Sequence, residues 1–231
     1  MMLAPEMRAG HPVRNFLNLQ ARERVGCLSV KTSICQQQEG EILEWILSVF
    51  AGVGLAAATG FRVFVPLLGV SVAGSLGILP LSANFEWLSS PVAMGALAIA
   101  TVLEVGTYFV PWLDNLMDTI AAPAAVGAGT IAAVSVLGDT SPFLTWAVAI
   151  VAGGGTAGVV HAGTSGARAV STATTGGVAN PALALGELVA SVSMTVLSIL
   201  VPVAAFLLVA WMLYWAAGRW SRWRRARVLA G

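Results

Sequence analysis

Two arginines lie in the apolar part of the chain, and their residue type gives the first indication of chemistry. Arg62 occurs in "GLAAATGFRVFVPLLGV" (54–70) and Arg168 in "GTSGARAVSTATTGG" (163–177). A guanidinium group presents a planar fork of N–H donors that suits a carboxylate or a phosphate. Side chains that follow Arg168 would add donors to the same site: Thr172, Thr174, Thr175 and Asn180. We therefore expect a substrate-binding site for an anionic group around the two arginines.

Four acids are candidate charge-pair or ion-coupling residues for this site: Glu104, Asp114, Asp118 and Glu187. The alternative to ligand binding is that Arg62 is a structural counter-ion. In that case it pairs with an acid such as Glu104, or its head reaches the membrane surface from the end of a span.

Asp114 and Asp118 are one helical turn apart in "PWLDNLMDT" (111–119), so they share a face if this segment is helical. Such a pair can bind a divalent cation, relay protons, pair with a cation or cap the helix that follows. A metal-dependent enzyme would also need a second acidic motif and more cations. His161, without a second histidine in the apolar region, is more typical of a packing residue. We therefore expect no metal, no cofactor and no catalytic residue.

The composition places these residues in a membrane. The chain is 57% hydrophobic and only 10% charged, whereas soluble domains carry about 25% charged residues. Between Trp45 and Gly218 there is no lysine, and the only arginines are Arg62 and Arg168. Several windows of about 18 residues are uncharged, which is the length that spans a bilayer. The sequence thus predicts an all-α, polytopic membrane protein. Its expected partner is the lipid bilayer in which it is embedded.

The hydrophobic segments predict five or six spans. The block 45–79 would be about 52 Å long as one helix, whereas the hydrocarbon core is about 30 Å thick. Gly60 and Pro66 are expected to break it into two spans, or into one span and a re-entrant piece. Further spans are expected at 91–110, 119–138, 143–162 and 188–217. The segment 163–187 is too polar and glycine-rich to face lipid, so we expect it to be broken or non-helical and covered by protein.

The two ends of the chain differ from this region. Residues 1–40 are a polar N-terminal arm, interpreted as disordered or weakly helical, or as an extension from an upstream start codon. Residues 41–218 form the expected transmembrane domain, and 219–231 form a basic tail with five arginines. Directly after an apolar span, such a tail favours a cytoplasmic C-terminus in a bacterial inner membrane over nucleic-acid binding. The orientation of the N-terminus stays open.

A self-comparison with a shift of 101 residues indicates an internal repeat. The matches include Trp45, Pro80 and Glu86 on Trp146, Pro181 and Glu187. The arginines do not align in this register, and glycine and alanine bias supplies some of the other matches. If the repeat is real, a single connecting span inverts the second half, as in many secondary transporters.

Three segments carry a family resemblance: "GVGLAAATGFRVFVPLL", "PWLDNLMDTIAAPAAVGAGT", and "STATTGGVANP" followed by a glutamate. They resemble the bacterial membrane family named domain of unknown function 4126. The resemblance covers about 42–217, which leaves out the N-terminal arm and the basic tail. It implies a membrane-embedded helical fold and no particular activity.

These patterns favour transport or binding of a small solute, an ion or a lipid headgroup at a site near the middle of the membrane. The alternative is a non-transporting scaffold or assembly partner whose buried charges lock helices together, and an intramembrane enzyme ranks third. Convergence of Arg62 and Arg168 on a cavity would favour binding. Separate pairs with Glu104 and Glu187 would favour the scaffold.

Overall fold

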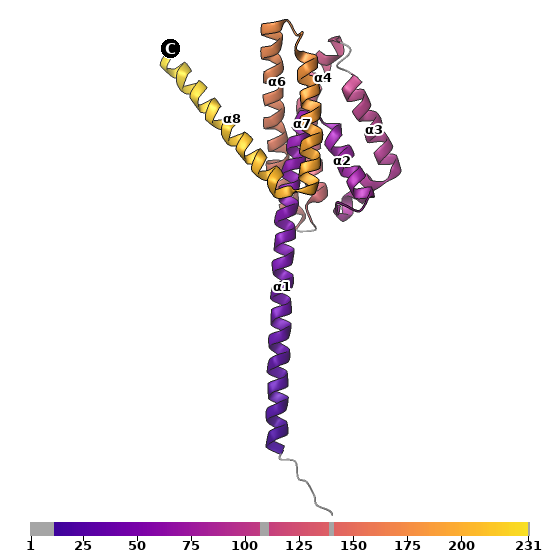
Figure 1. Cartoon of the computed structure of the whole chain (residues 1–231), viewed down its shortest axis with the longest axis vertical. Helices are drawn as coiled ribbons and strands as arrows, with labels where there is room; N and C mark the ends of the chain where they lie inside the picture. The colour runs from indigo at the N-terminus through magenta and orange to yellow at the C-terminus, as the bar shows by residue number, and fades with distance from the viewer. Residues whose placement is uncertain (1–11, 107–110, 139–140, 231) are drawn as a thin grey trace, which may run out of the picture. The chain divides into compact units, whose positions relative to one another are not determined.

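The computed structural model describes the backbone of residues 12–106, 111–138 and 141–230, and the side chains of 37–106, 120–138 and 141–219. These ranges are mostly helical and contain no strand, which confirms the all-α fold. The elements in chain order are α1 (Pro12–Phe61), α2 (Phe64–Ser75), η1 (Ala83–Ser89), α3 (Pro91–Gly106), α4 (Pro111–Val136), α5 (Pro142–Val148), the π-helical turn η3 (Ala149–Gly154), α6 (Gly155–Thr175), α7 (Asn180–Leu200) and α8 (Pro202–Ala230) (Figure 1).

The chain divides into two compact units, Met1–Glu44 and Trp45–Gly231, and the boundary falls inside α1. Residues 12–40 of the polar arm belong to α1, and residues 1–11 lie outside the described part of the chain. Apart from residues 37–44, which begin the first apolar stretch, the structure discussed below belongs to the second unit.

Several helices of the described residues are suited to crossing a membrane. Four stretches are long and apolar enough: Gln37–Phe61, Pro142–Thr175, Asn180–Leu200 and Pro202–Arg219. The consecutive helices η1 and α3, bent by 66° at the residue between them, make a fifth if they form one span. The chain is therefore a multi-pass membrane protein, and the count with the bent pair equals the lower of the two predicted numbers.

The first apolar block is broken at Arg62 and Val63, inside the predicted region. Pro66 lies in the first turn of α2, where the N–H that proline lacks would have no partner within the helix. With 12 residues, α2 is about 18 Å long and cannot cross a hydrocarbon core of about 30 Å. The alternative of two spans is therefore wrong for this block.

The prediction of non-helical backbone across 163–187 is wrong for most of that segment, because α6 continues to Thr175. The break is confined to residues 176–179, where Gly176 and Gly177 have φ of 63° and 87°. Thr174 and Thr175 donate their hydroxyl protons to the carbonyls of Val170 and Ser171, at 2.9 and 2.7 Å. These hydroxyls are thereby accommodated inside a helix. Several side chains of the segment, such as those of Ala167 and Val170, are exposed instead of covered by protein.

The last predicted span, 188–217, is two helices instead of one. α7 ends at Leu200 and α8 begins at Pro202, with Val201 between them at φ −138° and ψ 72°. Pro202 takes the first helical position of α8, where its fixed φ suits the helix and its missing N–H costs no hydrogen bond. The predicted span 143–162 lies in the continuous run α5–η3–α6, and 91–110 corresponds to α3, which counts as a span only together with η1. The predicted span 119–138 lies in α4, whose described apolar part, Ile120–Val136, is shorter than a span.

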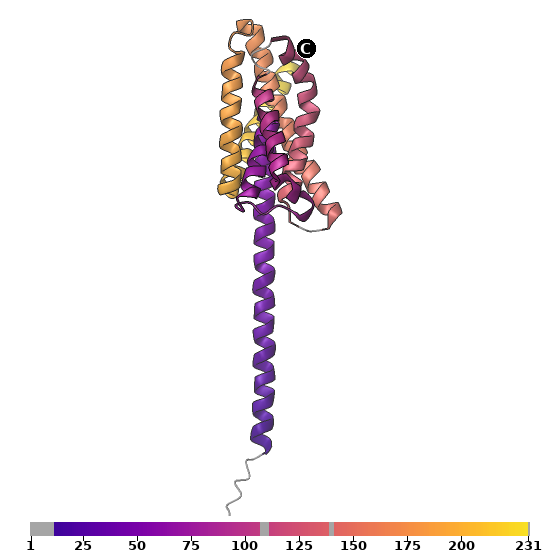
Figure 2. The ribbon, with the colours of Figure 1, turned by 90° about the vertical axis from the view of Figure 1, so that its right-hand side faces the viewer.

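The C-terminal part of α1 lies at the centre of the second unit (Figures 1 and 2). Its residues 51–60 are all buried. On one side Leu55 packs in a cluster with Val70 of α2 and Ala132 of α4. On the other side Ala57 of α1 belongs to a cluster with Met194 of α7. The end of α1, and the break that follows it, are therefore surrounded by the other helices.

Close packing of η3 on α4 leads to a first prediction. A Cβ atom on Gly153 would lie 2.6 Å from Ala133 Cβ and 2.9 Å from the carbonyl oxygen of Gly129. We expect Gly153→Ala to destabilise the protein by about 1–3 kcal/mol, because the backbone of α4 would have to move. Gly155→Ala is the matched control, since a Cβ there meets nothing within 4 Å. Thermal unfolding in detergent checks both variants, and equal melting temperatures would contradict this packing.

Candidate functional site

The break between α1 and α2 brings Arg62 into the interior, where it is only 2% exposed. Its Nη2 atom donates a hydrogen bond to the carbonyl oxygen of Ala184 on α7, at 2.7 Å. The same atom lies 3.8 Å from Oε2 of Glu187, also on α7. Ser191 adds another link, because its hydroxyl donates to the carbonyl of Ala58 at 3.0 Å. The end of α1 is thus attached to α7 by one ion pair and two hydrogen bonds.

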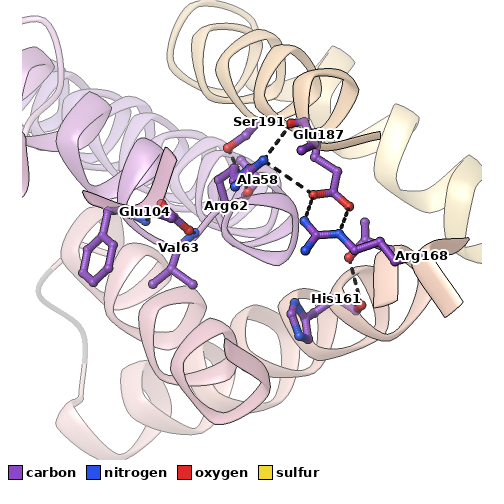
Figure 3. Close-up of polar contacts among 11 residues, drawn as sticks. Ala58, Arg62, Val63, Glu104, His161, Arg168, Glu187 and Ser191 are labelled. Atoms are coloured by element: carbon purple, nitrogen blue, oxygen red, sulfur yellow. Dashed lines mark hydrogen bonds and ion pairs between the residues drawn. The ribbon is translucent and has the colours of Figure 1, made fainter. Parts of the chain in front are cut away.

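Arg168 on α6 meets the same carboxylate as Arg62 (Figure 3). Its Nε atom donates to Oε1 of Glu187 at 3.0 Å, and its Nη2 atom donates to Oε2. The Glu187 side chain is 8% exposed and that of Arg168 is 12% exposed. We refer to Arg62, Glu187 and Arg168 as the Arg–Glu–Arg cluster. The cluster connects the end of α1 with α6 and α7 through charge-assisted hydrogen bonds, which are among the stronger ones in proteins.

Glu104 on α3 occupies the other side of the break. Its Oε1 atom accepts the N–H of Val63 at 2.7 Å, and its Oε2 atom accepts the N–H of Phe64 at 3.1 Å. The first N–H groups of a helix have no partner within it, and a negative charge is favourable there. Arg62 pairs with Glu187 on α7, and the Glu104 carboxylate caps α2. Both Arg62 and Arg168 still attract Glu104 electrostatically.

A cavity of about 820 Å³ lies beside this arrangement, between α1, α2, α3, α4 and α6. Arg168 and Glu104 contribute its charged lining, and four other polar residues line it: Thr59, His161, Thr164 and Ser165. The rest of the lining is apolar, including Phe61, Phe64, Leu103, Ile120, Ala121 and Ala124. A few charged and polar groups within a mostly apolar wall are the arrangement found in many small-molecule sites.

The hydroxyl and imidazole side chains of the cavity wall make hydrogen bonds mainly within their own helices. Thr59 donates to the carbonyl of Ala56 at 2.7 Å, and Thr164 donates to the carbonyl of His161 at 2.9 Å. The Ser165 hydroxyl and the Nε2 atom of His161 are 3.3 Å apart. Sequence reasoning missed Thr59, Thr164 and Ser165 as lining residues. Two of these residues could have been found from their spacing, because side chains three or four positions apart lie on the same face of a helix. Thr59 precedes Arg62 by three positions, and Thr164 precedes Arg168 by four.

Of the predicted substrate-binding residues, Arg168 lines this cavity, but Arg62 and the hydroxyl and amide residues do not. Thr172, Thr174 and Thr175 are exposed near the C-terminal end of α6. Asn180 donates its amide N–H to Thr172 Oγ1 at 3.1 Å, which closes the turn into α7. The reason is helical rise: seven residues separate Arg168 from Thr175, or about 10 Å along an unbroken helix. The side chains of Asp114 and Asp118 lie outside the described residues.

Comparison with known proteins gives one family and no named relative. No curated protein and no solved structure matches the chain. The family model described as Domain of unknown function (DUF4126) matches residues 49–222. This range contains the Arg–Glu–Arg cluster, Glu104 and the whole lining of the cavity. The chain therefore belongs to the Domain of unknown function (DUF4126) family.

Proposed function

We propose that the protein binds a small anionic solute or lipid headgroup in the cavity beside Arg168, as a step in moving it across the membrane. The observation that carries this proposal is the position of Arg168 on the wall of the cavity of about 820 Å³. Ligand sites have volumes of about 300–1,000 Å³ and combine apolar walls with a few placed polar groups. Ionisable side chains within membrane proteins are costly, and they commonly mark substrate or ion pathways.

The break next to the cavity supports a role in movement. Transporter sites are typically formed by discontinuous helices, whose interrupted backbone lies next to the substrate. Here Val63 and Phe64, at the start of the short α2, line the cavity. The helix N-terminus is already occupied by the Glu104 carboxylate. This proposal therefore assigns the anion to Arg168 and not to the start of α2.

One observation favours the scaffold as a second candidate function. The Arg–Glu–Arg cluster connects three helices, α1, α6 and α7. The side chains of Arg62 and Glu187 are nearly inaccessible to solvent. A purely structural role would need these contacts but would not need the cavity. The two functions differ in what a cavity-filling substitution does.

Ala124→Phe is the cavity-filling variant, because Ala124 lines the cavity from α4. In phosphatidylcholine nanodiscs, the melting temperature would be measured with acetate, inorganic phosphate, sulfate or decanoate. We expect at least one of these anions to raise the melting temperature of the wild type. The same anion should leave the melting temperatures of Ala124→Phe and Arg168→Gln unchanged. Ala167→Phe is the control, since Ala167 is exposed on the same helix as Arg168 and does not line the cavity.

Uptake of the same anion into proteoliposomes tests the transport step. The wild type and Ala167→Phe should take it up, and Ala124→Phe should not. Binding without uptake would limit the function to binding, and the absence of any stabilising anion would favour the scaffold.

We also propose that the membrane is the bacterial inner membrane and that the C-terminus is cytoplasmic. The support is the cluster of five arginines between Arg219 and Arg227, which follows the last apolar stretch. An alkaline phosphatase fused to the C-terminus should be inactive, because this enzyme matures only in the periplasm. High phosphatase activity would reverse the orientation.

A further inference from the structure

We propose that the ligand is an amphipathic monoanion, with one carboxylate or phosphate group at Arg168 and an apolar body in the rest of the cavity. This inference rests on the proposed function and adds the chemical class of the ligand. It follows from three properties of the cavity: the nature of its walls, its rim and its charges.

The walls of the cavity suit an apolar ligand body better than a polar one. Ten of the sixteen lining residues are apolar, and they include Phe61, Phe64 and Leu103. The Thr59 and Thr164 hydroxyl protons are already donated to carbonyls of their own helices. A polyhydroxylated solute would give up its hydrogen bonds to water and find few donors in exchange, which is costly. An alkyl chain would instead gain from leaving water.

The rim of the cavity is also apolar. Val102 and Leu103 on α3 are 70% and 64% exposed, and Ile120 on α4 is 52% exposed. All three line the cavity. Large exposed apolar side chains on helices of a multi-pass membrane protein are suited to contact with lipid chains. The apolar part of a ligand could therefore continue from the lipid phase into the cavity past these three side chains.

The two charged groups of the lining limit the ligand to one negative charge. The guanidinium of Arg168 donates Nε and Nη2 hydrogen bonds to Glu187 and, as a cation on the cavity wall, also attracts an anionic group there. Glu104 lines the same cavity and is fixed in place by the N–H groups of Val63 and Phe64. A second negative charge on the ligand would be repelled by this carboxylate in an environment of low dielectric constant.

The test compares probes that differ in charge and chain length, using the full chain in phosphatidylcholine nanodiscs. Binding of acetate, hexanoate, decanoate, decanol and decyltrimethylammonium would be measured by calorimetry. The Arg168→Gln variant is measured in parallel. Partitioning of the probe into the bilayer is the same for both proteins, so it cancels when the two binding signals are subtracted. We expect the Arg168-dependent affinity to rise from acetate to decanoate, by up to about fourfold per buried CH₂ group. Decanol and decyltrimethylammonium should show no Arg168-dependent binding. The Arg168→Gln substitution should weaken decanoate binding about tenfold or more.

A separate arm distinguishes the two sources of such a ligand. Nanodiscs that contain phosphatidylglycerol should weaken decanoate binding if the cavity takes the anionic headgroup and chain of a phospholipid. Unchanged decanoate affinity would assign the site to free alkyl carboxylates. Arg168-dependent binding of acetate or phosphate, with no gain from a longer chain, would overturn this inference and leave the proposed function standing. The absence of Arg168-dependent binding by every probe would overturn both.

Discussion

Replacing Glu187 with glutamine should destabilise the protein by about 3–5 kcal/mol, the cost expected for breaking a buried ion pair. The carboxylate lies between two guanidinium groups, with Arg168 bound to both of its oxygens and Arg62 at 3.8 Å. Glutamine keeps the size of the side chain but loses the negative charge. It also places an amide donor next to guanidinium groups that can only donate. The contacts between α6 and α7, and between α7 and the end of α1, should weaken together.

Thermal and denaturant unfolding in the same detergent would measure this loss. Glu86→Gln is the matched control, because Glu86 is exposed and its replacement should change stability by less than about 0.5 kcal/mol. The double variant Arg168→Gln/Glu187→Gln should be more stable than the sum of the two single losses predicts, since the two residues act as a pair. Additive losses, or a Glu187→Gln variant as stable as the wild type, would show that the cluster does not hold these helices.

Replacing Glu104 with alanine should cost about 2 kcal/mol or more and should loosen the break between α1 and α2. The carboxylate accepts two backbone N–H groups, those of Val63 and Phe64, at 2.7 and 3.1 Å. Removal leaves two N–H groups of a partly buried helix start without this acceptor. Glu104→Gln should lie between the wild type and Glu104→Ala, because glutamine keeps one acceptor oxygen and loses the other.

Hydrogen exchange of the peptide that contains Val63 and Phe64 is the most specific readout for Glu104. Exchange should be fastest in Glu104→Ala, intermediate in Glu104→Gln and slowest in the wild type. Glu86→Ala should leave it unchanged. Equal exchange in Glu104→Ala and the wild type would mean that this carboxylate does not cap α2.

The parts of the structure set by local sequence could be predicted. Gly60 and Pro66 on either side of Arg62 correctly indicated a broken helix, because both residues disfavour an uninterrupted one. The helix starts at Pro91 and Pro142 follow from the same chemistry. The polar segment after Arg168 was misjudged, since its threonines can bond to carbonyls one turn earlier and so remain helical.

The partners of the charged residues depend on tertiary packing and could not be predicted individually. Arg62, Arg168 and Glu187 were all candidates, but nothing in their spacing shows that one carboxylate lies between both arginines. The role of Glu104 depends on the N–H groups of Val63 and Phe64. These groups can bond to its carboxylate because the helix breaks there and leaves them without a partner within a helix. The internal repeat stays a prediction, since Arg62 lies at a break while Arg168 lies inside a continuous helix.

The central claim is that the cavity beside Arg168 holds an anionic ligand. The most direct measurement is a crystal structure with decanoate that carries a bromine atom at the end of its chain, located by anomalous scattering. The predicted result is bromine density inside the cavity lined by Leu103, Ile120 and Ala124, with the carboxylate within hydrogen-bond distance of Arg168. Bromine density only on the outer surface, or an unchanged cavity at a concentration of decanoate that saturates binding, would contradict it.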